Sequence, residues 1–242
     1  MSSEERALAA LTRAHGLPTT ARPGLSLLLD ALADPEAPTT IHARKQAIDA
    51  HLADSLVALE IPEVAEAGVI ADLGAGAGLP GLALAVALPG AQMTLVESTG
   101  RKCAYLERTI DSMGLSERAS VVCERAEAWP AGIGRFDVVT ARALAALPVL
   151  VEYAAPLLRV GGSLVAWKGR RVREEEAAGV AAAEVLGMEL TQVRRVRPYA
   201  DAHYRHLHVL RKVRATPSGY PRRPGMAVKR PLAAPESDRV RQ

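Results

Sequence analysis

The sequence predicts an α/β fold, in which a mostly parallel seven-stranded sheet carries helices on both faces and ends in an antiparallel C-terminal hairpin. Three observations support this prediction. Strand-like and helix-like runs alternate from residue 69 onward, a glycine-rich turn joins the first strand to the first helix, and no helix separates the last two strands. We expect strands at 69–73, 93–96, 120–123, 136–140, 163–167, 189–196 and 206–213.

Helices are predicted between the parallel strands, because parallel neighbours need a crossover connection. The first helix, 80–88, begins at Pro80, which suits a first helical turn since its missing amide would have no partner there. The Gly161-Gly162 pair is expected to turn the chain into the fifth strand. The other predicted helices span 101–113, 147–158 and 174–186.

A small helical extension, residues 1–62, is expected to precede the sheet. Its last helix is predicted over 41–59, because apolar residues recur there at three- and four-residue spacing. Residues 63–214 are expected to form the sheet domain. Residues 215–242, which are rich in proline and arginine, are expected to form a basic tail.

Composition excludes several classes of protein. No apolar run approaches the roughly 18 residues that a membrane helix needs, and the charged N-terminus lacks the apolar segment of a signal peptide. We therefore expect a cytoplasmic protein with no membrane partner. Cys103 and Cys123 fit no metal-ligand spacing, so no metal site is predicted, and they are expected to pack as free, small apolar residues.

Positive charge is concentrated in the C-terminal part of the chain. Residues 1–158 hold 12 Lys and Arg against 19 Asp and Glu, whereas residues 159–242 hold 18 against 8. This asymmetry indicates either a polyanionic partner for the C-terminal part or a solubilising tail. Because only 3% of the residues are aromatic, a stacking platform for single-stranded nucleic acid is not expected.

The run 71–81, ADLGAGAGLPG, ends the first strand and opens the first helix. Its glycines allow a ligand to approach the backbone closely, and the amides at the helix start would face that ligand. The spacing Gly76-x-Gly78-x-x-Gly81 also satisfies the dinucleotide fingerprint, so an NAD(P)-dependent oxidoreductase is one alternative. Asp72 instead favours a cofactor with a cationic group, such as S-adenosylmethionine, because it would repel a pyrophosphate. Glu97, at the end of the second strand, would accept hydrogen bonds from ribose hydroxyls.

Five segments carry a resemblance to one known family. They are His51-Leu52-Ala53-Asp54-Ser55-Leu56, the glycine run with its Leu79-Pro80-Gly81 ending, Arg125-Ala126-Glu127, Thr140-Ala141-Arg142-Ala143, and 220–225 with 229–232. In this order they resemble the bacterial 16S ribosomal RNA guanine-N7 methyltransferases, also called glucose-inhibited division protein B. The resemblance spans roughly residues 38 to 232. The chain departs from the family pattern at Pro38-Thr39-Thr40 and at Met226.

The resemblance implies a class I methyltransferase with a Rossmann-like sheet. It would transfer a methyl group from S-adenosyl-L-methionine to N7 of a guanine in 16S ribosomal RNA, acting on that RNA or on the small ribosomal subunit. We expect a monomer. Gly74 and Leu79 would contact the methionine and ribose, and Ala126 and Glu127 the adenine. The predicted cofactor-binding residues are Gly74, Gly76, Gly78, Leu79, Glu97, Ala126, Glu127 and Arg142.

Methyl transfer to guanine N7 needs positioning rather than a general base, because N7 carries a free lone pair. The predicted catalytic residues are Arg142, Arg222 and Asp54. Arg142 would lie beside the cofactor and the incoming base. Asp54 would favour the positive charge that develops on the base, or would serve only as a helix-surface carboxylate. Arg222 would hold RNA phosphates together with Arg223, Lys229 and Arg230. A non-catalytic RNA-binding protein of the same fold is the remaining alternative.

Overall fold

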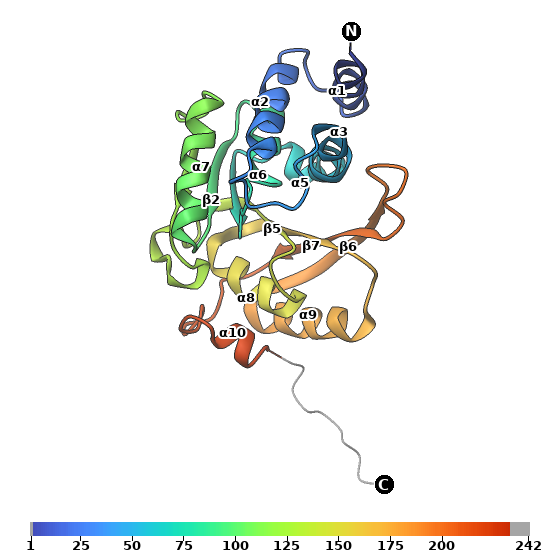
Figure 1. Ribbon diagram of the computed structural model, residues 1–242. Coiled ribbons are helices and arrows are strands. Elements are labelled where there is room, and N and C mark those ends of the chain that lie inside the picture. The colour runs from blue at the N-terminus through green and yellow to red at the C-terminus, as the bar shows by residue number, and fades with distance from the viewer. Residues whose placement is uncertain (1, 233–242) are drawn as a thin grey trace.

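A computed structural model describes residues 2–232 and shows a central seven-stranded sheet between layers of helices (Figure 1). The strand order is β3-β2-β1-β4-β5-β7-β6. The first five strands run parallel, and β7 lies antiparallel to both β5 and β6. The strands are β1 (Val69–Leu73), β2 (Gln92–Val96), β3 (Ala119–Val122), β4 (Phe136–Arg142), β5 (Leu158–Lys168), β6 (Met188–Val196) and β7 (Arg205–Lys212).

The connecting helices cover both faces of the sheet. They are α6 (Gly81–Ala87), α7 (Gly100–Ser112), α8 (Leu147–Leu157) and α9 (Arg173–Leu186), with two short 3-10 turns, Ala126–Ala128 and Pro130–Gly132, before β4. One apolar core joins α6 and α7 to one face, and a second joins α8 and α9 to the other. The predicted fold class is therefore confirmed, with element ends within a few residues for most strands and helices.

The N-terminal helices pack outside α6 and α7, on the face opposite α8 and α9 (Figure 1). They are α1 (Ser3–Ala14), α2 (Ala21–Ala33), α3 (Arg44–Ala47), a π-helical stretch (Ile48–Ala53), α4 (Asp54–Leu56), a 3-10 turn (Val57–Glu60) and α5 (Pro62–Ala65). The prediction of one regular helix over 41–59 is thus wrong. The wider π turn interrupts it just before Asp54, whose buried carboxylate has partners elsewhere in the fold.

Two other predictions need correction. Gly161-Gly162 does not precede β5 but lies inside its span, at an irregularity where the pairing with β4 passes from Leu158 with Phe136 to Ser163 with Val138. A Cβ atom on Gly162 would come within 2.8 Å of the Asp137 carbonyl oxygen, so glycine is needed for the close approach of this irregular stretch to β4. Cys103 and Cys123 are not free, since the structure joins them in a disulfide. Their separation in sequence hides that α7 packs against β3, which brings the two side chains together.

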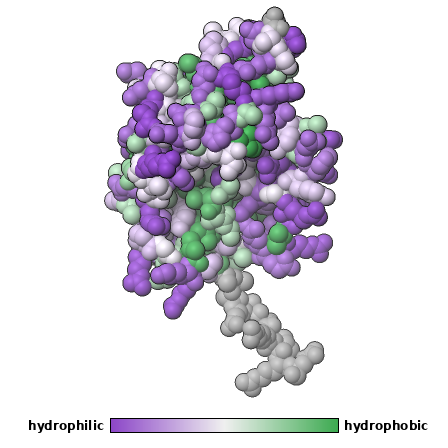
Figure 2. All heavy atoms as spheres, in the orientation of Figure 1, coloured by the Kyte–Doolittle hydropathy of each residue, from purple (hydrophilic) through white to green (hydrophobic). Residues whose placement is uncertain are grey.

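The C-terminal segment returns to α8. Its short helix α10 (Met226–Lys229) buries Ala227 against the core around α8. The residues of the predicted tail beyond 232 lie outside those that the structure describes. Within residues 2–232, no helix is long and apolar enough to cross a membrane. Figure 2 shows that hydrophilic residues dominate the face drawn there.

Candidate active site

The glycine-rich turn follows β1 at the carboxyl edge of the sheet, where ligands bind in open α/β folds. At Gly74 the backbone has φ +66°, and a Cβ atom would lie 2.6 Å from Leu144 Cδ1. At Gly78, φ is +87° and a Cβ atom would lie 2.4 Å from Leu82 Cδ1. Both positions therefore require glycine, the first for close approach to the loop after β4 and the second for packing against α6.

A cavity of about 440 Å³ opens beside this turn. Glu97, buried at the end of β2, organises its floor. One carboxylate oxygen accepts the Ser98 and Thr99 amides, both at 2.9 Å, and the other accepts the Gly76 amide at 3.2 Å. The cavity is lined by Leu73, Gly74, Val96, Glu97, Ser98, Thr99, Lys102, Glu124, Arg125, Ala126, Glu127, Ala143, Leu144, Ala145, Tyr153 and Val228.

The C-terminal segment closes the far end of this cavity. The Gly225 amide donates to Glu127 Oε1 at 3.0 Å, and Val228 contributes to the lining. Tyr153 lies beside Glu127, and burial together with this carboxylate raises the pKa of the tyrosine hydroxyl. Glu127 therefore connects the cavity to a segment almost a hundred residues away in sequence.

Asp72 does not line the cavity, so its preference for a cationic cofactor would act at a distance rather than through contact. It is fully buried under α6, where it accepts the Gly81 amide at 3.0 Å and the Thr140 hydroxyl at 2.8 Å. Strand alternation is the reason: Asp72 shares the α6 face of β1 with Ile70, whereas Leu73 lies on the other face. Burial raises the Asp72 pKa to about 6.

A second cavity, of about 470 Å³, adjoins the first across the loop after β4, because Ala143 and Ala145 line both. Ala143 has φ +54°, unusual for a residue other than glycine, and marks the sharp turn between the two cavities. The second cavity is lined by Ile41, Ala50, His51, Asp54, Arg142, Ala143, Ala145, Trp167, Lys168, Gly169, Tyr199 and Arg205.

Asp54 is the hub of the second cavity. Its side chain is 2% exposed, and its two oxygens accept from Arg142 Nη1 at 2.9 Å and from Arg205 Nε at 3.0 Å. The Trp167 indole donates to the Asp54 carbonyl at 2.7 Å. The carboxylate is therefore engaged by two guanidinium groups, and its position fixes two arginines that come from β4 and β7.

His51 lies one turn before Asp54 on the π-helical stretch. Its Nε2 lies 2.8 Å from the Thr39 hydroxyl, so the divergent 38–40 segment still reaches this cavity. Burial, followed by the charge of Arg142, lowers the His51 pKa. The imidazole is accordingly neutral at neutral pH and adds no positive charge to the two arginines.

The structure brings only part of the predicted set together. Gly74, Glu97, Ala126 and Glu127 line the first cavity, and Asp54 and Arg142 line the second. Gly76 supports Glu97 through its amide, while Gly78 and Leu79 belong to the packing of the turn. Arg222 lines neither cavity: its guanidinium donates to the buried Glu152 carboxylate of α8, with Nε 2.7 Å from Oε1.

Sequence reasoning missed several lining residues, namely Tyr153 and Val228 in the first cavity and Trp167, Tyr199 and Arg205 in the second. Trp167 could have been found, because it lies one residue before the end of β5, at the same edge of the sheet as Glu97 and Arg142. Arg205 could not, since its place depends on how β7 inserts between β5 and β6.

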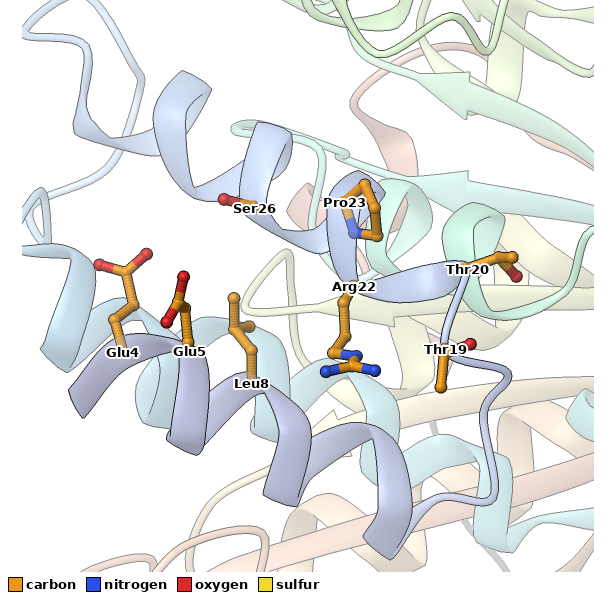
Figure 3. A pocket seen from close by; sticks show the side chains of 8 residues that line it. All are labelled: Glu4, Glu5, Leu8, Thr19, Thr20, Arg22, Pro23 and Ser26. Carbon is orange, nitrogen blue, oxygen red and sulfur yellow. The ribbon is translucent and has the colours of Figure 1, made fainter. Parts of the chain in front are cut away.

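A larger hollow, of about 670 Å³, lies between α1 and α2 (Figure 3). Glu4, Glu5 and Leu8 project into it from α1, and Arg22 projects from α2. None of the residues that line it belongs to the glycine turn or to a strand end. The strand-end cavities, and not this larger one, therefore form the candidate active site.

Comparison with known proteins points to one family. A protein-family model described as rRNA small subunit methyltransferase G (GidB) matches residues 37–206. Ribosomal RNA small subunit methyltransferase G of Rubrobacter xylanophilus is 45% identical over 188 residues, covering 75% of this chain and 72% of that protein. The protein of the same name from Chloroflexus aggregans is 42% identical over 197 residues, covering 80% and 82%.

Solved structures share the fold at low identity. Mitomycin 7-O-methyltransferase MmcR has a TM-score of 0.51 at 14% identity, covering 67% of this chain and 53% of that chain. The [4+2]-cyclase SpnF has a TM-score of 0.55 at 19% identity, covering 81% and 97%. One fold thus serves a methyltransferase and a cyclase, so the reaction has to be argued from the family and from the site.

Proposed function

The chain belongs to the rRNA small subunit methyltransferase G family, and we propose that its two adjoining cavities hold the methyl donor and the acceptor guanine. The family assignment makes it an S-adenosylmethionine-dependent methyltransferase that methylates guanine N7 in 16S ribosomal RNA. The observation that carries this proposal is the shared wall at 143–145, which would bring two ligands into contact at one strand end.

The residues of the first cavity fit S-adenosylmethionine. Its volume lies in the range of small-ligand sites, roughly 300–1,000 Å³. Three carboxylates, of Glu97, Glu124 and Glu127, line it against the two cations Lys102 and Arg125, which suits a positively charged cofactor and disfavours the pyrophosphate of NAD.

Individual contacts in this cavity support the same assignment. Within residues 2–232, Glu97 Oε2 accepts the Gly76 amide alone, at 3.2 Å, and is 4.0 Å from Lys102 Nζ, so it can still accept a ribose hydroxyl. Ala126 and Val228 offer apolar surface to the adenine ring. When bound, the cofactor supplies an electrophilic methyl group on a sulfonium.

The residues of the second cavity fit a guanine. The guanidinium groups of Arg142 and Arg205, held by Asp54, retain N–H donors for the guanine O6 or for a phosphate, and such contacts leave N7 free to react. Trp167 and Tyr199 provide aromatic walls for a planar base. With the guanine held in this way, its N7 lone pair would be open to take the methyl group from the bound cofactor, leaving the sulfur neutral and the purine positively charged.

No side chain has to remove a proton in this reaction, so the protein acts by positioning. Asp54 is proposed to act through the two arginines that it orients, rather than by touching the base. The neutral state of His51 limits the positive charge that would oppose formation of the methylated purine cation. We propose that the enzyme acts as a monomer and works on its ribosomal substrate in the cytoplasm.

The division between the two cavities can be tested by titration calorimetry with S-adenosylhomocysteine. Glu97→Gln should weaken its binding about ten-fold, since a charged acceptor at the ribose is lost. Arg142→Ala should leave this binding within about two-fold of wild type, while transfer of labelled methyl to guanine N7 in small subunits falls about 100-fold. If Arg142→Ala weakens cofactor binding as much as Glu97→Gln does, the first cavity does not bind the cofactor independently of the second. Binding of NAD in place of S-adenosylhomocysteine would contradict the cofactor.

A further inference from the structure

The connection between β6 and β7, residues 197–204, carries an exposed aromatic residue beside an arginine from another loop. The Arg170 guanidinium carbon lies 4.1 Å from the centroid of the Tyr204 ring. Tyr204 is 54% exposed, and Arg170 is exposed as well. An exposed cation–π pair contributes little to folding. Stability therefore does not account for the part of the Tyr204 ring that stays open to solvent.

Arg170 and Tyr204 lie on two segments of the chain, and both segments adjoin the acceptor cavity. Arg170 directly follows Gly169, and Tyr204 directly precedes Arg205, and both of these neighbours line the cavity. The two segments are held in register by the pairing of Lys168 with His206 and by the approach of His206 Nδ1 to the Gly169 carbonyl at 2.8 Å. A strand of RNA that places one base in the cavity would therefore bring a neighbouring base to Tyr204.

Two further arginines, Arg195 and Arg197, add positive charge along the loop that carries Tyr204. Arg195 donates to the His203 carbonyl and Arg197 to the Ala200 carbonyl, so both guanidinium groups lie along the loop that holds Tyr204. Among the residues that the structure describes, neither arginine forms a salt bridge, nor does Arg170. Asp201 is the one acidic residue between 195 and 205. Free guanidinium groups beside an exposed ring are the elements of a single-strand binding site.

We propose that Arg170 and Tyr204 form a stacking platform for an unpaired base next to the target guanine, and that Arg195 and Arg197 hold the adjoining phosphates. The proposal rests on the proposed function, because it takes the second cavity as the acceptor site. It reverses the expectation that the chain lacks an aromatic platform. That expectation came from a low total of aromatic residues, whereas a platform requires only one ring at the right place.

Equilibrium binding of RNA tests the platform independently of methyl transfer. The probe is a fluorescein-labelled oligoribonucleotide of mixed sequence, measured by anisotropy as a single strand and annealed to its complement. Tyr204→Leu should weaken single-strand binding about ten-fold, the size expected for one stacked base, with a smaller change for the duplex. Tyr204→Phe, which keeps the ring, should restore most of the affinity. Ile133→Ala removes an equally exposed apolar side chain elsewhere, at 52% exposure, and serves as the matched control.

The phosphate contacts are tested by salt titration of the same probe. Arg195→Ala with Arg197→Ala should reduce the slope of log affinity against log salt by about 1.4, roughly 0.7 for each contact with a single strand. Equal single-strand binding by Tyr204→Leu and wild type, or a wild-type protein that does not bind the single strand, overturns the platform. Binding with this pattern but without methyl transfer to small subunits would instead contradict the proposed function and leave the platform standing.

Discussion

The C-terminal segment, residues 219–232, and the β6–β7 hairpin, residues 188–212, are both rich in arginine, but the fold uses their charges differently. In the C-terminal segment, Arg222 donates to the buried Glu152 carboxylate and to the Arg230 carbonyl. In the hairpin, Arg205 enters the acceptor cavity, and Arg195 donates to the His203 backbone carbonyl. Arg222 thus anchors a segment, whereas Arg205 serves a site and Arg195 stays open to a partner; Arg194 of the hairpin is paired with Glu60.

This difference shows why a count of charges does not locate an RNA-binding surface. Arg222 pairs one-to-one with the buried Glu152 carboxylate, so its charge is compensated and little field is left for a phosphate. Asp54, by contrast, is shared by Arg142 and Arg205, so these two arginines keep a net positive charge. Arg223, Lys229 and Arg230 remain exposed in the C-terminal segment, but they flank the cofactor cavity, which Val228 lines. The hairpin instead flanks the acceptor cavity, where RNA has to enter.

The largest expected effect concerns the hairpin residue that reaches the acceptor cavity. Arg205→Ala should lower kcat/KM for methyl transfer to small subunits about 100-fold, because one of the two donors held by Asp54 is lost. Binding of S-adenosylhomocysteine should change by no more than about two-fold. Arg214→Ala, at an exposed arginine just past the other end of β7, is the matched control. Activity close to wild type in Arg205→Ala would place the acceptor elsewhere.

The next effect is on stability and concerns the C-terminal segment. Arg222→Ala leaves the Glu152 carboxylate, 2% exposed, without its cation, and should lower the free energy of unfolding by about 3 kcal/mol. Urea denaturation followed by circular dichroism measures this change. Arg159→Ala breaks a more exposed pair with Asp137, with arginine 57% exposed, and should cost less than about 1 kcal/mol. A stability equal to wild type in Arg222→Ala, with weaker RNA binding, would return Arg222 to the role of a phosphate contact.

Much of the fold could be predicted from the sequence because its signals are local. Strand and helix periodicity can be recognised within each short segment. The first strand, the glycine turn and Glu97 lie within about 30 residues of one another along the chain. The arrangement of the acceptor cavity could not, because it is set by long-range pairing. Asp54 meets Arg142 and Arg205 across 88 and 151 residues. The burial of Arg222 against Glu152 likewise depends on where the chain returns after β7, and nothing in its local sequence distinguishes it from Arg223.

The smallest expected effect comes from freeing Arg171, an arginine near the hairpin that is held in an ion pair with Glu176. Glu176, on α9, accepts from Arg171 at 2.7 Å and from His208 at 3.0 Å, and the arginine first, with the histidine, lowers its pKa to about 2. Because the folded pKa lies below the ordinary value of 4.5, the stabilisation from ionised Glu176 is complete above pH 4.5 and is lost only as pH falls towards 2. At neutral pH the ion pair between Arg171 and Glu176 therefore stays formed.

Glu176→Gln opens that pair at neutral pH without removing a hydrogen-bonding side chain. The freed Arg171 guanidinium should raise the salt slope of single-strand RNA binding by up to about 1 and the affinity by a few-fold. Anisotropy titrations at several salt concentrations measure both quantities, and Glu189→Gln, at an exposed glutamate of β6, controls for the change in net charge. An equal gain in both variants would mean that RNA senses only the overall charge, and the distinction between paired and free arginines in the hairpin would then carry no functional weight.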